Sequence, residues 1–456
     1  MAPAVNLLRP RSPSSFGWLT STPTVPTATS TAVRMPNVIS APETSVHRFV
    51  LGNGLRVIVE PDKRNRLVSV ALTVGVGSRT DSASTRGMAH LVEHLMFPRC
   101  KESSGRGHLR NVESSGGICD GVTHRDHTSY YSVIGSDQLE SLLFWEAGRL
   151  ASFAVDQDML DSELAIVGEE IRIANVASHG GYPWTTAASA LFGKENHAGG
   201  DHGIIEHLDR ITPAAAEAFH RRWYTPNNLV LSIVGDVTAA RVESAVNAAF
   251  GALSGPARDE PRRNKVIIAA SSHVRHHAPR FAGTGVAIGL ATPDVRTVPH
   301  AYVAHAVLTE VLNSSRIPRL KIKEPRLRSA CVYFGFHGEW FNTSVSDLQV
   351  TQIVHEPGWL DAETAFDNEL AVLSTDGPRP GELTRAVNAL LLAHHRQLDS
   401  LATRAVAHGR FELLFPYLSG HAAVPQLLAA VSDSNLSTAA TSMLVQPRVV
   451  VKLNGE

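Results

Sequence analysis

Cysteine is scarce in this sequence of 456 residues, which contains only Cys100, Cys119 and Cys331. Three scattered cysteines are too few for a disulfide framework, and none has the paired spacing of a zinc ribbon. The default expectation is therefore a reducing compartment, in which thiols stay free.

Excess charge and long apolar runs are also missing. The formal net charge is −1, so no overall field attracts nucleic acid or an anionic membrane. No apolar run reaches the ~18–20 residues that a membrane-spanning helix needs. Hydrophobic residues make up 43% of the chain and charged residues 19%, which is typical of a soluble globular protein. We predict two or three domains from the length, with no nucleic-acid partner and no membrane anchor.

The first 45 residues have no acidic side chain before Glu43 and are rich in Ser, Thr and Pro. They lack the apolar core of roughly 7–15 residues that a secretory signal needs. Arginines among serines are typical of a mitochondrial transit peptide, but prolines such as Pro10 and Pro23 would break its amphipathic helix. We predict a disordered leader over residues 1–45, or a start at Met35. A bacterial cytoplasmic location follows, with the mitochondrial matrix as the alternative.

The segment His90-Leu91-Val92-Glu93-His94 carries the first chemical signal. Successive residues of a helix turn by about 100°, so His90, Glu93 and His94 share one face, while Leu91 and Val92 belong to the face that packs. Two histidines one turn apart can bind one zinc ion at ~2.0–2.1 Å. The glutamate beside them is placed to take a proton from a zinc-bound water. This order, H-x-x-E-H, inverts the common H-E-x-x-H signature of zinc proteases.

A third ligand is needed to distinguish this site from a chance match in a chain with 22 histidines, or from a solvated helix face. Residues 157–175 predict a helix with an apolar stripe; Glu163 and Glu170 lie at its edge and Glu169 points to solvent. A carboxylate at the border of a buried stripe is costly unless it is paired or metal-bound. We therefore predict Glu170 as the third zinc ligand and Glu163 as a carboxylate that orients a ligand histidine from behind. The alternative is that both are ordinary surface glutamates.

The remaining pattern predicts two α+β units of similar size, residues 46–255 and 266–456, joined by a polar linker at 256–265. Only the first unit has H-x-x-E-H. Its elements are expected as a hairpin at 49–59, strands at 68–76, within 116–134 and before Gly235, and helices at 138–155, 157–175 and 238–250. The second unit is expected to contain strands near 266–270, 285–291, 331–352 and 449–451 and helices near 300–313, 360–373 and 381–399.

Several motifs accompany the two metal-binding segments. About 75 residues separate His94 from Glu170, which lies in ELAIVGEEI, and Y-x-P-x-N precedes V-G-D at 224–236. In these motifs, and in the glycine-led pattern at 116–131, the chain resembles the pitrilysin-type inverzincin zinc metallopeptidases, in the short form of the mitochondrial processing peptidases and their bacterial relatives. The resemblance implies two homologous α+β domains, each a mainly antiparallel sheet with packed helices, which enclose a chamber. It also implies one zinc ion per chain, on the N-terminal domain.

The resemblance further implies a substrate-binding edge strand, on which the substrate peptide adds as an extra strand. The corresponding residues here are Asp120, Gly121, Val122 and Thr123. The family has Asn in place of Asp120 and Ala in place of Gly121. We expect main-chain pairing to survive these changes, whereas a side-chain contact to the peptide backbone becomes carboxylate-specific.

A second departure lies in the C-terminal unit, where the family has an Arg and a Tyr that hold the carbonyl side of the substrate. In the register anchored on Ser314-Ser315-Arg316, these positions hold Ile322 and Ser329, and neither can stabilise a developing oxyanion as that pair does. We therefore predict a heterodimer with a homologous subunit that lacks the zinc motif and supplies the pair. A shifted register would instead bring in one of three side chains: Arg326, Arg328 or Tyr333.

Three functions remain compatible with this sequence. The first is a zinc endopeptidase that cleaves peptides or unfolded segments by promoted-water hydrolysis, for example to remove a leader peptide. The second is a non-catalytic structural subunit, as family members in respiratory complexes are, although the metal constellation is complete here. The third is a zinc-held scaffold that binds peptides without cutting them; Glu93 argues against it, because a structural zinc site is closed by a fourth protein ligand and needs no base. We favour the endopeptidase.

Overall fold

The computed structural model describes residues 45–82, 84–97, 107–177, 184–193, 203–255, 268–277, 284–313, 319, 326–357 and 361–454. The predicted leader (except residue 45), the predicted linker at 256–265 and the positions Cys100, Ser314–Arg316 and Ile322 lie outside these ranges. Cys119 and Cys331 are free thiols. No helix of the described residues is both long and apolar enough to span a membrane.

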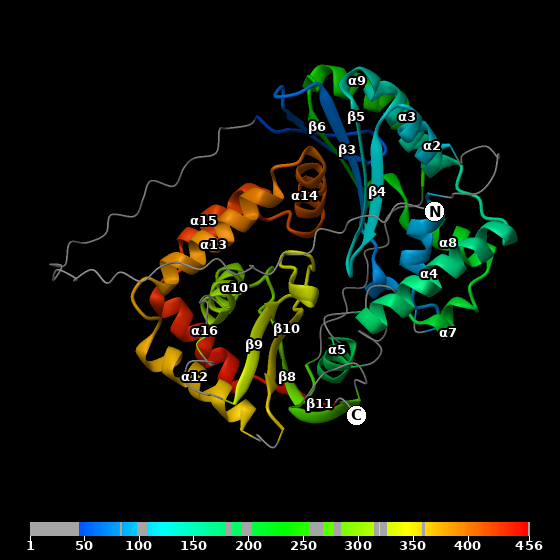
Figure 1. Cartoon of the computed structure of the whole chain (residues 1–456). Coiled ribbons are helices and arrows are strands. Elements are labelled where there is room, and N and C mark those ends of the chain that lie inside the picture. The colour runs from blue at the N-terminus through cyan, green and yellow to red at the C-terminus, as the bar shows by residue number, and fades with distance from the viewer. Residues whose placement is uncertain are drawn as a thin grey trace, which may run out of the picture. The chain divides into compact units, whose positions relative to one another are not determined.

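The N-terminal half contributes a mixed six-stranded sheet, here called sheet A (Figure 1). The strand order is β1-β2-β6-β3-β5-β4, in which β2 and β6 are parallel and every other neighbouring pair is antiparallel. Strand β4 forms one edge. The strands are β1 (His47–Val50), β2 (Arg56–Pro61), β3 (Leu67–Val74), β4 (Ile118–Thr123), β5 (Thr128–Gly135) and β6 (Leu229–Gly235).

The C-terminal half contributes a five-stranded sheet, sheet B, in the order β7-β11-β8-β10-β9. Its strands β7 and β11 are parallel and its other neighbours antiparallel, so sheet B repeats the connectivity of sheet A from β2 to β4. Edge strand β9 corresponds to β4. The strands are β7 (Ser272–His277), β8 (Thr284–Ala291), β9 (Leu327–Phe334), β10 (Leu348–His355) and β11 (Arg448–Asn454). The fold is therefore α+β, with two similarly built sheets, as the sequence predicts.

Helices pack on one face of each sheet and bury the two main hydrophobic cores. Next to sheet A lie α1 (Met88–Leu95), α2 (His108–Ser114), α3 (Leu139–Ala151), α4 (Gln157–Ala177), α7 (Ile205–Leu208), α8 (Pro213–Trp223) and α9 (Ala239–Phe250). Next to sheet B lie α10 (Pro299–Asn313), α12 (Ala362–Asp376), α13 (Glu382–Gln397), α15 (Val424–Ala429) and α16 (Asp433–Val445).

The other face of each sheet is covered by a helix from the opposite half of the chain (Figure 1). Helix α14 (Leu401–Leu414) packs on β3, β5 and β6, and α5 (Trp184–Phe192) packs on β8 and β11. Small residues permit the close approach: a Cβ on Gly409 of α14 would lie 2.2 Å from Thr73 Oγ1 of β3. The two halves are interlocked by this exchange, which the sequence analysis did not predict.

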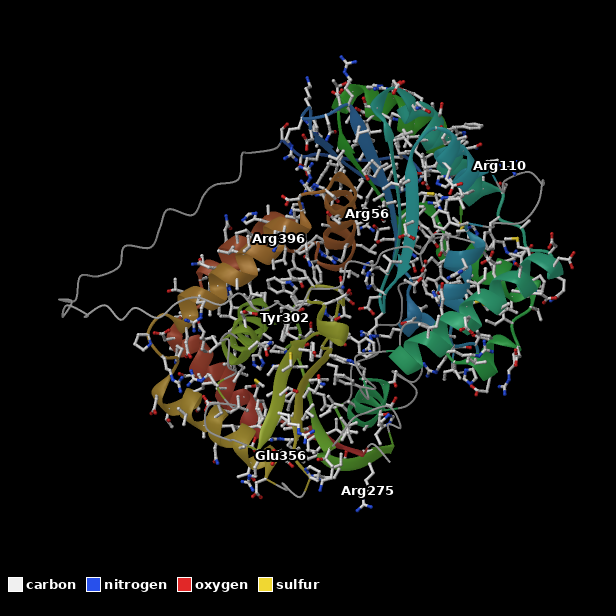
Figure 2. The ribbon with its side chains drawn as sticks, in the orientation of Figure 1. Arg56, Arg110, Arg275, Tyr302, Glu356 and Arg396 are labelled. Atoms are coloured by element: carbon white, nitrogen blue, oxygen red, sulfur yellow. The ribbon has the colours of Figure 1, made fainter. Side chains whose placement is uncertain are left out.

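Ion pairs and hydrogen bonds reinforce the exchange. Arg404 of α14 contacts Glu60 at 2.8 Å and also contacts Asp62, at the end of β2. Arg56 of β2 (labelled in Figure 2) donates to the backbone oxygen of Glu412 in α14 at 3.3 Å. The turn after β4 is tied to the C-terminal half as well, because Arg125 Nη1 lies 2.9 Å from Asp347 Oδ1.

One predicted element is wrong. The sequence suggests a strand near 266–270, but β7 begins at Ser272. Of the expected segment, the described residues 268–270 are not a strand, and the backbone N–H of Ala269 donates to Leu191 O at the end of α5. The actual strand, SHVRHH, is polar because it is an exposed edge of sheet B, so its hydrophobic signal is weak.

Candidate metal centre

Helix α1 is anchored so that its histidine face points inward. Leu91, Val92 and Leu95 are buried in the core, as the spacing of apolar residues predicts. The N-terminus of α1 is capped by Asp81, whose Oδ2 accepts from Gly87 N at 2.7 Å and whose Oδ1 accepts from Ala89 N at 3.0 Å. Sequence reasoning missed this cap, because Asp81 lies six residues before the N-cap position where capping side chains are sought.

Helix α4 crosses α1 and brings Glu170 to both histidines. Its Oε2 lies 3.3 Å from His90 Nε2 and 3.3 Å from His94 Nε2. The three possible ligand atoms all lie within 4.8 Å of one another. Ligands held ~2.0–2.1 Å from a tetrahedral zinc ion are about 3.3 Å apart, so these side chains fit zinc with little movement.

Glu163 and Glu169 occupy opposite sides of α4. Glu163 is buried, and its Oε2 lies 3.4 Å from His94 Nδ1, the ring nitrogen that faces away from Glu170. A carboxylate at this position fixes the ring so that Nε2 is free to bind a metal. Glu169 lies in solvent beside Arg172 and is directed away from the histidines.

The electrostatics of the centre favour a cation. Burial alone would lower the pKa of His94, but the carboxylates of Glu163 and Glu170 outweigh it and raise that pKa to about 9. Burial tends to raise the pKa of Glu170, but hydrogen bonds with His90 and His94 hold that pKa well below its usual range. The cluster is thus a carboxylate held against two imidazoles, which suits a divalent metal.

Glu93 lies beside the cluster, beneath edge strand β4. Its Oε2 accepts a 2.6 Å hydrogen bond from Thr123 Oγ1, and burial raises the pKa of its carboxyl group. Gly121 permits the strand to approach this closely, since a Cβ there would lie 3.1 Å from Glu93 Oε1 and 3.0 Å from Phe97. Glycine at position 121 therefore allows β4 to lie in tight contact with the carboxylate of Glu93.

Successive residues of β4 face opposite sides of sheet A. Gly121 and Thr123 face Glu93, whereas Ile118 and Val122 face away and are 63% and 38% exposed. Asp120 is also exposed, and its Oδ1 accepts from the N–H of Gly121. No described strand pairs with the outer edge of β4, so its main chain can accept an added strand.

A cavity of about 1080 Å³ lies on the exposed side of β4. Residues of both halves line it, from Ile118 and Val122 of β4 to Cys331 and Tyr333 of β9 and several side chains of α10, α13 and α14. Tyr333 also packs against Trp184 of α5, with ring centroids 5.3 Å apart.

The predicted C-terminal substrate contacts lie partly outside the described residues, as Ile322 does. Ser329 is exposed on β9, and Arg326 and Arg328 are exposed at the start of that strand. Tyr333 lines the cavity. The structure thus gathers His90, His94, Glu170, Glu163, Glu93 and Thr123 into one centre, while Asp120 and Val122 lie on the other side of β4.

Models of two protein families match this chain. The family described as "Insulinase (Peptidase family M16)" matches residues 56–177, which include H-x-x-E-H and Glu170. The family described as "Peptidase M16 inactive domain" matches residues 210–390. The chain belongs to peptidase family M16.

Curated relatives in this family are named zinc proteases. The chain is 28% identical to an uncharacterized zinc protease of Mycobacterium leprae over 298 residues, 64% of this chain and 66% of that protein. It is 22% identical to an uncharacterized zinc protease of Bacillus subtilis over 399 residues, 86% of this chain and 93% of that protein. This chain thus spans slightly less than two thirds of the Mycobacterium leprae protein.

Solved structures share the fold at lower identity. A protease from Helicobacter pylori superposes with a TM-score of 0.77 at 20% identity, covering 90% of this chain and all of that one. A chain of Complex III2 from Candida albicans gives 0.73 at 14% identity, with 90% and 96% covered. A peptidase M16 inactive domain from Pseudomonas fluorescens gives 0.73 at 17% identity, with 90% and 97% covered.

Proposed function

We propose that this protein is a zinc-dependent endopeptidase that cleaves peptides or unfolded segments. The observation that supports this most strongly is the convergence of His90, His94 and Glu170 at the spacing of a tetrahedral metal site, with Glu93 buried beside them. The relatives named zinc proteases support the same activity.

The chain's own residues would share the work of hydrolysis. His90, His94 and Glu170 would hold the zinc ion, which as a Lewis acid would polarise the substrate carbonyl and lower the pKa of a bound water. Glu93 accepts a proton at Oε1, because Thr123 occupies Oε2, and then delivers it to the leaving amine. Burial raises the pKa of Glu93, which makes its carboxylate a stronger base.

Strand β4 would hold the substrate. An extended peptide that pairs with its outer edge lies next to Gly121, directly above Glu93. A folded domain cannot present such a segment, so we expect unfolded substrates. Removal of a leader peptide from a ribosomally made precursor in the bacterial cytoplasm fits this geometry, and presequence removal in a mitochondrial matrix is the alternative.

We further propose that the chain is the catalytic half of a heterodimer. The C-terminal half matches a family described as an inactive domain. In addition, the exposed Ser329 occupies the position at which the Tyr of the Arg/Tyr pair is expected. A homologous subunit without the zinc motif would supply that pair to the substrate. Robust cleavage by the purified chain alone, unchanged on adding such a homologue, would contradict this.

A non-catalytic structural role is the competing function. The likeness to a chain of Complex III2 and to an inactive domain favours it. The complete set of His90, Glu93, His94 and Glu170 opposes it, since a structural subunit has no use for a base beside an open metal site.

The test is cleavage of an unfolded peptide by the purified chain, with and without its homologue, together with zinc analysis. We expect one zinc ion per chain. The substitution Glu93→Gln should keep the zinc and lower turnover about 10²–10⁴-fold, which is the usual contribution of a general base. Zinc binding without any cleavage in either arrangement would favour the structural role.

A further inference from the structure

Arg410, a partly buried arginine in the cavity beside β4, differs from several fully buried arginines of the described chain. Those arginines contact carboxylates: Arg125 contacts Asp347, Arg149 contacts Glu146, Arg319 contacts Glu369 and Glu382, and Arg404 contacts Glu60 and Asp62. Arg410 instead donates from Nη1 to the amide oxygen of Asn342, a neutral group. Its Nε is buried and has no hydrogen-bond partner.

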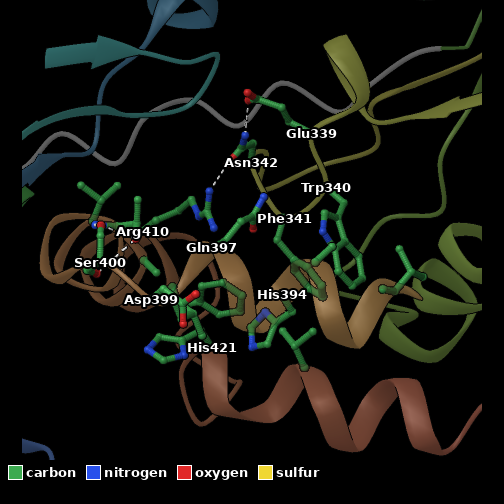
Figure 3. A pocket seen from close by; sticks show the side chains of 18 of the residues that line it. Glu339, Trp340, Phe341, Asn342, His394, Gln397, Asp399, Ser400, Arg410 and His421 are labelled. Carbon is green, nitrogen blue, oxygen red and sulfur yellow. Dashed lines mark hydrogen bonds between the residues drawn. The ribbon is translucent and has the colours of Figure 1, made fainter. Parts of the chain in front are cut away.

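Arg410 projects from α14 into the cavity of about 1080 Å³ (Figure 3). Aromatic side chains such as Trp340 and Phe341 line the same space, together with neutral polar ones such as Asn342 and Gln397. Burial lowers the pKa of Arg410, and the charge of Glu339 offsets this effect only in part. A desolvated guanidinium is costly to keep unless an anion pairs with it.

The other charged groups around this cavity are committed elsewhere or not bonded to Arg410. Glu339 Oε2 accepts from Asn342 Nδ2 and lies 3.4 Å from His124 Nδ1, and its side chain is half exposed. Arg64 pairs with Asp62. Glu310 and Asp399 also line the cavity, but the side-chain hydrogen bond described for Arg410 goes to Asn342 and to neither of them. His394 and His421 are uncharged near neutral pH, because burial lowers the pKa of His394 to about 4 and of His421 to about 2.

We propose that Arg410 is the carboxylate-binding residue of this cavity, and that it selects peptide substrates with an acidic side chain or a free C-terminal carboxylate. This rests on the proposed peptidase function. A strand added to β4 directs every second side chain to the face of Ile118 and Val122, which line the cavity that holds Arg410. A guanidinium fork suits a carboxylate, and the neutral Asn342 amide is the hydrogen-bond partner that Arg410 has in this cavity.

The experiment measures peptide binding by fluorescence anisotropy in the Glu93→Gln background, which prevents cleavage. Four labelled peptides of one sequence combine Glu or Gln at a single position with a free or amidated C-terminus, so the two sources of carboxylate are separated. We expect at least one carboxylate peptide to bind about tenfold or more tightly than its neutral counterpart. The substitution Arg410→Met should reduce that ratio to about one, and Arg410→Lys should retain part of it.

Arg64→Met is the matched control, because Arg64 lines the same cavity but already pairs with Asp62. It should leave the ratio unchanged. A ratio that survives Arg410→Met, or an equal loss for charged and neutral peptides, would overturn the proposal, since a merely structural arginine would weaken both alike. If the Arg410→Met protein does not fold, the ratio of affinities is compared between Arg410→Lys and Arg64→Met instead.

A second measurement separates this site from the peptidase activity. Glutarate, compared with chloride at equal ionic strength, should raise the melting temperature of the protein but not of Arg410→Met. If no peptide binds or is cleaved while glutarate still protects through Arg410, the carboxylate site stands and the peptidase function fails. If peptides are cleaved with no charge preference and glutarate has no effect, the carboxylate site fails and the peptidase function stands.

Discussion

Two clusters in the described chain contain the same side chains, two histidines and a glutamate, with possible ligand atoms within 4.8 Å of one another. We call them the α1 cluster (His90, His94 and Glu170) and the α14 cluster (Glu60, His408 and His421). In composition and proximity they are alike. Their surroundings differ, and the surroundings decide which one can hold a metal.

In the α14 cluster both oxygens of the glutamate are already bonded. Glu60 Oε1 accepts from Arg404 at 2.8 Å, and Glu60 Oε2 lies 2.6 Å from His408 Nε2. Burial, neighbouring histidines and nearby arginines lower the pKa of His421 to about 2. The carboxylates near the α1 cluster instead raise the pKa of His94 to about 9. A histidine whose surroundings repel a proton also repels a metal cation, so the α14 cluster is a structural network.

The largest expected difference is in zinc content. Glu170→Ala removes one of three ligands and should abolish stoichiometric zinc binding and peptide cleavage. Glu169→Ala, one residue away on the solvent face, should change neither. His421→Ala should leave one zinc ion per chain, because the α14 cluster holds none. Metal analysis that finds two zinc ions, or an effect of Glu169 equal to that of Glu170, would remove the distinction between the clusters.

The next effect is on stability and belongs to the α14 cluster. Arg404→Met leaves Glu60 and Asp62 without their buried counter-charge and should cost about 3–5 kcal/mol in the free energy of unfolding. Zinc content should not change. Arg241→Met breaks an exposed pair with Glu140 and should cost about 1 kcal/mol or less. Urea unfolding of the wild type and the two variants measures these free energies. Equal losses for Arg404→Met and Arg241→Met would contradict the structural role of the α14 cluster.

The pH dependence of stability should follow from His421. Its folded pKa of about 2 lies below the unfolded value of ~6.5, so the unfolded chain takes up a proton first. This contribution is complete above pH ~6.5 and is lost as the pH falls below it, on the order of 1–2 kcal/mol by pH ~5. His421→Gln should reduce the loss, whereas His47→Gln, on exposed β1, should not. Unfolding curves at two pH values check this, and identical slopes would refute it.

The sequence predicts much of the α1 cluster because its information is local. Helical spacing puts His90 and His94 on one face, and the same argument separates Glu170 from Glu169. The sequence also predicts two similarly built units, because both halves show the same order of strands and helices. The contact between Glu60 and Arg404 is what excludes the α14 cluster as a metal site. These two residues are 344 positions apart, so the sequence alone does not reveal that they are in contact.

What the sequence does not reveal depends on contacts between distant segments. The exchange of α5 and α14 depends on small residues such as Gly289 and Gly409. A glycine in the sequence indicates that another segment packs closely against it but does not identify that segment. Asp81 caps α1 from outside the usual capping position. The side-chain contact of Thr123 with Glu93 joins two elements, so periodicity within β4 suggests its face and not its partner.

The smallest effect concerns a feature that is found beside the α1 cluster and not beside the α14 cluster. This feature is the close contact between edge strand β4 and the general base Glu93. Gly121→Ala places a methyl group 3.1 Å from Glu93 Oε1 and 3.0 Å from Phe97, tighter than an ordinary contact. A small shift of β4 relieves it, so the fold and the zinc ion should be retained. Turnover should nevertheless fall several-fold, on the order of tenfold, because misplacing a base by a fraction of an ångström is costly.

Val122→Ala is the matched control for that substitution, because Val122 lies on the same strand but faces the cavity. It should raise KM with little effect on kcat, whereas Gly121→Ala should lower kcat. Steady-state kinetics with one unfolded peptide, together with zinc analysis of both variants, separate the two outcomes. If Gly121→Ala changed KM alone, β4 would serve only to bind the substrate, and the contact between the strand and Glu93 would have no part in turnover.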